Sequence, residues 1–205
     1  SSEASDLYKG QLVVDIDHVS KPTYTPAFVE ICDPLKRMGG NGVTLLACKV
    51  KYRGNTSIRY DKKSFTIQVV DGQGEELNAN LFGLRRDKIW VLDAMAVDRI
   101  RMRNRVNFDV WNAMSRVPYD TELDRRNGTV GLFVELFING EYHGLYCFTD
   151  KVNRKLLDLK KPRVDDKGQP IIRGVLYKGR EWSSATRLRG YETDTTWQKK
   201  VERMG

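Results

Sequence analysis

The sequence predicts an α+β fold in which a mostly antiparallel sheet is accompanied by one main helix. Three observations support this prediction. Residues 131–149 contain two β-rich runs joined by an Asn-Gly pair. Residues 12–19 alternate between apolar and polar side chains, as a half-buried strand does. The main helical pattern spans about residues 98–116.

The first part of the chain is expected to consist of strands separated by turns. Asp33-Pro34 ends one apolar run, and Asp71-Gly72-Gln73-Gly74 follows another as a turn. The expected strands are Leu12–Val19, Ala27–Cys32, Val43–Tyr52, Ser64–Val70 and Lys88–Ala94.

Asp98 is typical of a helix N-cap, and Pro118 is expected to stop the helix at about Arg116. At 100° per residue, Arg103 intrudes on the predicted buried face and Asn104 lies at its edge. Two interpretations of Arg103 stay open: it snorkels or pairs with a core carboxylate such as Asp93 or Glu135, or it lines a polar cleft for phosphate or a catalytic carboxylate. The predicted face comprises Ile100, Met102, Val106, Val110, Trp111, Ala113, Met114 and Val117.

Asn139-Gly140 is the clearest turn signal in the sequence. It joins Gly131–Ile138 to Glu141–Thr149, and both of its residues tolerate the positive φ of a type I′ turn. On strict alternation, Glu135 shares a face with Phe133 and Phe137, and burial there requires a nearby cation.

Composition indicates a soluble, globular chain of 205 residues with a net charge of +8. Residues 151–205 hold 15 basic and 7 acidic residues, so the basic excess lies in this last quarter. We find no transmembrane segment, and because Ser1 is not an initiator Met, we expect a signal segment to have been removed upstream. The three cysteines, Cys32, Cys48 and Cys147, fit either one disulfide with one free thiol or three reduced thiols.

Cationic and small polar residues follow a predicted strand at Arg53-Gly54-Asn55-Thr56-Ser57, a composition suited to holding phosphate or forming a plain turn. Lys62-Lys63 opens the next strand, and alternation sends one of these side chains to each face. The sequence thus predicts half of an anion pocket beside the hairpin.

Five blocks in register resemble the spore-coat protein H (CotH) kinase family over roughly residues 43–155. They are K-Y-R-G-N-T-S at 51–57, K-K-S-F-T-I at 62–67, L-F-G-L-R-R-D-K-I-W-V-L-D-A at 81–94, M-R-N-R at 102–105, and F-V-E-L-F-I-N-G-E-Y-H-G-L-Y at 133–146 leading into T-D-K-V. The resemblance implies an atypical protein-kinase-like fold, ATP and Mg²⁺ as cofactors, and phosphorylation of Ser on surface or coat proteins. It also implies an extracytoplasmic or cell-surface location, or the spore coat in a spore former.

On this resemblance, residues 1–150 are a kinase-like small lobe, and residues 151–205 are a hinge with the beginning of a truncated large lobe. Cofactor-binding roles are expected for Arg53 and Lys63 on phosphate, Arg103 and Asn104 in the cleft, Glu135 as a partner for a cation, and Lys151 at the hinge, with Asn55 beside Arg53.

The sequence departs from ordinary kinases in several places. The helix carries no Glu, and H-R-D, D-F-G and G-x-G-x-x-G are all absent from the sequence. Neither catalytic nor metal-binding residues are identified, and we expect them beyond Gly205. Enzyme activity of this chain is therefore left open, and an inactive fragment is expected.

Two alternatives to a kinase remain. The first is a non-catalytic surface or coat binding module with the same fold. The second is nucleic-acid binding by the basic C-terminal region with Tyr177, Trp182 and Tyr191, but its basic residues are interleaved with acidic ones and carry no known motif, so we expect no nucleic-acid partner.

Overall fold

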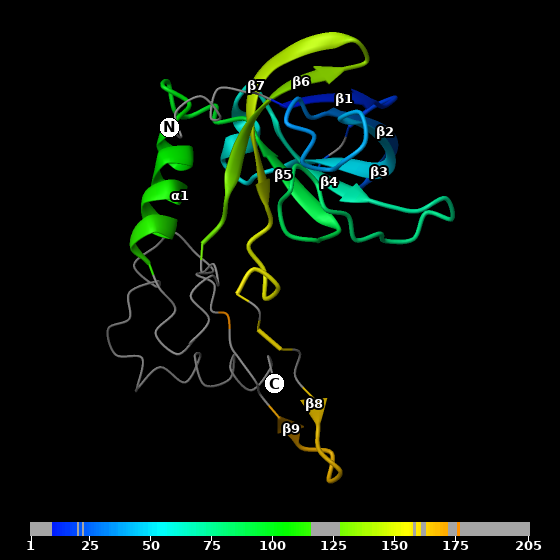
Figure 1. Ribbon diagram of the computed structural model, residues 1–205, viewed down its shortest axis with the longest axis vertical. Coiled ribbons are helices and arrows are strands. Elements are labelled where there is room, and N and C mark those ends of the chain that lie inside the picture. Colours follow the sequence, from blue (N-terminus) through cyan, green and yellow to red (C-terminus); the bar gives the residue numbers. More distant parts are fainter. Residues whose placement is uncertain are drawn as a thin grey trace. The chain divides into compact units, whose positions relative to one another are not determined.

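The computed structural model describes residues 10–19, 21, 23–115, 128–157, 159–160, 163–171 and 176 (Figure 1). The chain divides into two units, residues 1–151 and residues 152–205. In the described part of the second unit, β8 (Arg163–Val164) pairs with β9 (Pro170–Ile171). The predicted helix end at Arg116 and the aromatic residues of the basic region lie outside the described residues.

Seven strands of the first unit form a closed barrel in the order β1-β2-β3-β4-β5-β7-β6. The predicted α+β fold, resembling a kinase small lobe, is therefore wrong, because the fold is mostly β and its described residues contain a single α-helix. The barrel strands are β1 (Gly10–Asp15), β2 (Thr25–Cys32), β3 (Val43–Arg53), β4 (Ser64–Val69), β5 (Ile89–Asp93), β6 (Gly131–Ile138) and β7 (Glu141–Asp150).

The pairing of β1 with β6 closes the barrel, and it is the one parallel pair among these strands. Asn139 secures it: its side-chain oxygen accepts the Ile16 N–H at 2.9 Å, and its side-chain NH₂ donates to the Ile16 carbonyl at 2.8 Å. The Asn139 N–H also donates to the Val14 carbonyl at 2.9 Å. Asn139 and Gly140 have φ values of 51° and 81°, so the Asn-Gly turn both reverses the chain and anchors β1.

Large apolar side chains fill the barrel interior, because alternate residues of each strand point inward. Trp90 stacks on Phe148 at 5.2 Å between ring centroids, and Phe82 meets Phe148 edge-on at 5.2 Å. Phe82 belongs to the loop between β4 and β5, and together with Leu81 and Leu84 it is buried against the barrel. The end of the barrel at which β1 begins is therefore closed by this loop.

The helix α1 (Arg103–Met114) begins five residues later than predicted, and none of its residues is buried. Arg101, with φ of 58°, is incompatible with helix and delays its start. The prediction of a wide buried face is wrong, because Val106, Val110 and Met114 are 46%, 48% and 78% exposed. Figure 1 shows α1 lying beside β6, where Gly131 allows close approach: a Cβ there would be 3.2 Å from the Phe108 ring.

All three cysteines are free thiols, which settles the alternatives left by the sequence. Burial raises the pKa of Cys48 and of Cys147 to about 12 in each case. Neither thiol is therefore a nucleophile at neutral pH. No helix within the described ranges is long and apolar enough to cross a membrane.

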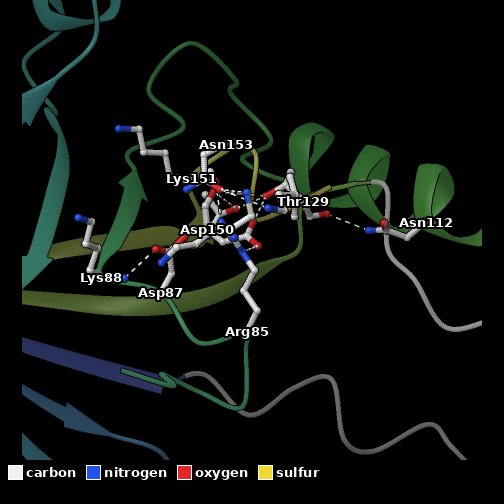
Figure 2. Close-up of polar contacts among 11 residues, drawn as sticks. Arg85, Asp87, Lys88, Asn112, Thr129, Asp150, Lys151 and Asn153 are labelled. Carbon is white, nitrogen blue, oxygen red and sulfur yellow. Dashed lines mark hydrogen bonds and ion pairs between the residues drawn. The ribbon is translucent and has the colours of Figure 1, made fainter. Parts of the chain in front are cut away.

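A buried ion network holds the closing loop to the end of β7 (Figure 2). The Arg85 guanidinium donates to Asp150 at 2.8 Å and forms an ion pair with Asp87 at 2.9 Å. It also donates to the Lys151 carbonyl at 2.7 Å, while the Thr129 hydroxyl donates to the Asp150 carboxylate. Asp87 and Asp150 are both buried, so one cation neutralises part of the charge of two desolvated carboxylates.

We predict that Arg85→Ala destabilises the chain by about 3 kcal/mol, because it leaves two buried carboxylates without their shared cation. Lys88→Ala is the matched control. Lys88 pairs with Glu76 at a more exposed site, and its loss is expected to cost less than about 1 kcal/mol. Urea unfolding followed by circular dichroism measures both values. Equal losses in the two variants would show that the Arg85 network contributes no more than a surface pair.

Candidate functional site

Polar and charged side chains gather at the end of the barrel opposite the closing loop. Here β3 ends, β4 begins and β5 ends, with Arg53 opposite Ser64 and Phe65 opposite Leu92 in the strand register. Phe65 also lines a small apolar hollow inside this end of the barrel, between Val14, Ile138 and their neighbours. The strand ends therefore carry polar groups around an apolar floor.

Asp93, the last residue of β5, is the hub of the hydrogen bonds at this end. Its carboxylate accepts the Ser64 hydroxyl at 3.4 Å, the Met95 N–H at 3.0 Å and the Asn104 side-chain NH₂ at 3.2 Å. The Ser64 hydroxyl in turn accepts the Ala94 N–H at 2.9 Å. These bonds link β4, β5 and the first turn of α1.

Lys62 lies beside this hub. Its ammonium donates to the Leu145 carbonyl and lies 4.2 Å from the centre of the Tyr146 ring. Gly144, with φ of 93°, lies in the bulge of β7, and a Cβ at this position would be 3.5 Å from the Lys62 Nζ. Burial, and then the nearby Arg101, lower the pKa of Lys62 to about 8, while Asp93 acts in the opposite direction.

Arg101 is the second cation of the cluster. It is half-buried, and its guanidinium donates to the Ala94 carbonyl at 3.3 Å. Its charge affects both Lys62 and Tyr146, because it lowers the pKa of each. Burial nevertheless raises the pKa of the Tyr146 phenol to about 12, so the phenol stays neutral and its OH donates to the Lys63 carbonyl at 3.1 Å.

The local charge is not balanced. Among the described residues, neither Lys62 nor Arg101 forms an ion pair with a carboxylate, and their hydrogen-bond partners are backbone carbonyls. Asp93 is the nearby acid, and its oxygens already accept three hydrogen bonds. Two half-buried cations with neutral partners give this end of the barrel a local positive charge that favours an anion.

Comparison with known protein families assigns the chain to one of them. The family described as CotH kinase protein matches residues 50–204, which include every strand from β4 onward and both cations. The chain belongs to the CotH kinase protein family. A comparison with curated proteins gave no match.

In this CotH-family chain, the structure places Arg53 at the exposed end of β3 and Asn55 in the exposed turn that follows. Lys63 lies one residue before β4, and its ammonium donates to the carbonyls of Ile58 and Tyr60. These bonds close the short 3-10 turn η2 (Ser57–Arg59). Arg53 and Asn55 thus flank the site, whereas Lys63 organises the turn beside it.

The remaining predicted residues are divided between two regions. Arg103 pairs with Asp98 at 2.9 Å with its side chain 65% exposed, and Asn104 donates to Asp93. Glu135, half-buried on β6, is in register with Leu145, whose carbonyl accepts Lys62. Lys151 follows Asp150, which pairs with Trp90 near the start of β5, and it belongs to the buried network at the other end of the barrel.

Lys62 and Arg101 are the two cations that sequence reasoning did not select. The sequence did indicate that one of Lys62 and Lys63 faces inward, but alternation alone does not say which. Arg101 gave no signal, because the helical pattern placed it inside a helix. Its backbone has a positive φ instead, which is uncommon for a non-glycine residue.

The described residues offer different support for the two cofactors that the family name suggests. Lys62 and Arg101 fit an anionic phosphate group, because both cations lack a carboxylate partner. For a metal ion, the described part of the chain contains no group of three His, Cys, Asp or Glu side chains. We therefore assign no metal ligands.

Proposed function

We propose that this chain binds the phosphate groups of ATP for a CotH-family kinase that phosphorylates Ser on surface or coat proteins. The observation that carries the proposal is the pair of half-buried cations, Lys62 and Arg101, with no carboxylate partner among the described residues. The family match supports the reaction class. A protein substrate and a location at the cell surface or spore coat follow from the family alone.

In this proposal the two cations have complementary tasks. Arg101 offers a planar guanidinium that can contact two phosphate oxygens at once, whereas Lys62 supplies a compact charge. Both are anchored by backbone carbonyls, so little reorganisation is needed when phosphate arrives. Arg53 and Asn55, which flank the site, are proposed to contact the outer part of the nucleotide.

Asn104 and Glu135 are proposed to organise the pocket around Lys62. Asn104 fixes one oxygen of Asp93, and Glu135 lies on β6 beside the strand segment that accepts Lys62. Arg103, which pairs with Asp98, is proposed to support the loop before α1. Lys151, the last residue of the first unit, is proposed to mark a hinge before the second unit.

The phosphate site predicts measurable nucleotide binding. We expect ATP to raise the thermal midpoint of the chain, because a ligand that binds only the folded state stabilises it. Lys62→Met and Arg101→Met should each weaken ATP binding by about tenfold or more, the loss expected for a charge-assisted hydrogen bond. Isothermal titration calorimetry, with and without Mg²⁺, gives the affinities.

Lys49→Met is the matched control for Lys62→Met. Lys49 is also half-buried and also donates to a backbone carbonyl, that of Gly74 at 2.8 Å, but it pairs with Gln68 toward the other end of β4. Its removal should leave ATP affinity unchanged. If the native chain shows no ATP binding, the proposed function is wrong, and the non-catalytic binding module becomes the better interpretation.

The lowered pKa of Lys62 predicts that ATP binding depends on pH. A phosphate bound beside Lys62 stabilises the protonated amine and raises its pKa, so the charged form is the one that binds. Affinity should be full below the free-state pKa of about 8 and should fall above it. Between about pH 7.5 and about pH 9.5 the loss should be roughly tenfold or more.

Lys62→Arg separates this effect from other titrations, because its guanidinium stays protonated throughout the range. The variant should bind ATP with an affinity that does not fall between about pH 7.5 and about pH 9.5. Calorimetry in two buffers of different ionisation enthalpy should show proton uptake at pH 8 for the native chain and none for the variant. An equal decline in both proteins would exclude Lys62 as the titrating group.

A further inference from the structure

Arg101 occupies its place because of an unusual loop. Residues 94–102 connect β5 to α1, and near each end of this loop a non-glycine residue has a positive φ: 51° at Met95 and 58° at Arg101. Such a conformation is unfavourable for a residue with a Cβ, so it persists only where surrounding contacts hold it. The contacts that hold Arg101 therefore determine where its charge lies.

Asp98 supplies most of those contacts. One carboxylate oxygen accepts the Ile100 N–H at 3.2 Å, and the other accepts the N–H groups of Met102 at 3.0 Å and Arg103 at 2.8 Å. The Arg103 guanidinium adds an ion pair at 2.9 Å. The Asp98 carbonyl also accepts the Arg101 N–H at 3.0 Å. The residues on both sides of Arg101 are thus fixed by one side chain.

The chemistry of Asp98 agrees with such a structural task. Its pKa is lowered, chiefly by the hydrogen bond from the Arg103 N–H, so the carboxylate is ionised at neutral pH. Its charge is matched by Arg103, which leaves Arg101 free of an acidic partner among the residues described. In this loop, Arg101 keeps its charge without an acidic partner among the described residues, whereas Arg103 neutralises the acid that holds the loop.

We propose that Asp98 is a positioning residue for anion binding: it holds Arg101 in the backbone conformation that keeps the guanidinium near Lys62, against the Ala94 carbonyl. The inference rests on the proposed function and deepens it, because it assigns the geometry of the site to a residue outside the pocket. Arg103 contributes to this role of Asp98, because its guanidinium neutralises the Asp98 carboxylate.

The test measures ATP affinity by calorimetry in Asp98→Ala, Arg101→Met and the double variant. Asp98→Ala should weaken binding by about as much as Arg101→Met, roughly tenfold, and the double variant should be no weaker than Arg101→Met alone. Asp98→Asn keeps one acceptor oxygen and should retain part of the affinity. A residue that only stabilises the fold would give none of this non-additivity in protein confirmed as folded by circular dichroism.

Asp71→Ala is the matched control. Asp71 accepts the N–H groups of Gln73 and Glu75 in an exposed turn that follows the other end of β4. Its loss should leave ATP affinity unchanged. If the native chain binds ATP and Asp98→Ala binds equally well, or if the two losses add in the double variant, the inference is overturned while the proposed function stands. If the native chain does not bind ATP, both fail.

Discussion

The parallel pairing of β1 with β6 is the constraint on which the rest of the first unit depends. It turns a series of antiparallel strands into a barrel without free edges, and the Asn139 side chain fixes its register through both polar groups of Ile16. Closure determines which strand ends meet. Because β3 and β5 end where β4 begins, Arg53, Ser64 and Asp93 come to one end of the barrel.

The two ends of the barrel differ in how their charged side chains are partnered. At the closed end, two buried carboxylates share the Arg85 guanidinium, and hydroxyl and backbone donors satisfy the remaining oxygens. At the other end, Lys62 and Arg101 donate to backbone carbonyls, and the nearby Asp93 carboxylate is already committed to other hydrogen bonds. The carboxylate oxygens at the closed end are therefore satisfied by donors of the chain itself, whereas the two cations at the other end lack a carboxylate partner among the described residues and favour an added negative charge.

The sequence predicted local features better than the fold. The Asn139-Gly140 hairpin was predictable, because the turn and both strands depend on adjacent residues. Barrel closure was not, because a parallel pair has no connecting turn to reveal it. The helix start was misplaced for a related reason. Apolar spacing extends back to Ile100, but the αL conformation of Arg101 is imposed by the contacts of Asp98, which spacing does not report.

The candidate site was predictable in kind but less so in detail. The motifs predicted cations beside a hairpin, and three of the predicted residues lie around this end of the barrel: Arg53 at the end of β3, Asn104 in the first turn of α1 and Glu135 on β6. Which of Lys62 and Lys63 reaches the site depends on the turn after β3. Because Lys63 closes the 3-10 turn after β3, Lys62 is the neighbour left to reach the bulge at Gly144.

The helix α1 illustrates how polar contacts, instead of burial, place an element beside this site. None of its residues is buried, so hydrophobic packing contributes little to its position. Its first turn is held by Asp98 and, through Asn104, by Asp93, and farther along the helix Phe108 faces Gly131 on β6. Of the same two aspartates, Asp93 precedes the loop that carries Arg101 and Asp98 lies within it. The orientation of the helix and the position of the Arg101 guanidinium are therefore set by one group of hydrogen bonds. A change in the orientation of the helix should shift the guanidinium, and the reverse should also hold.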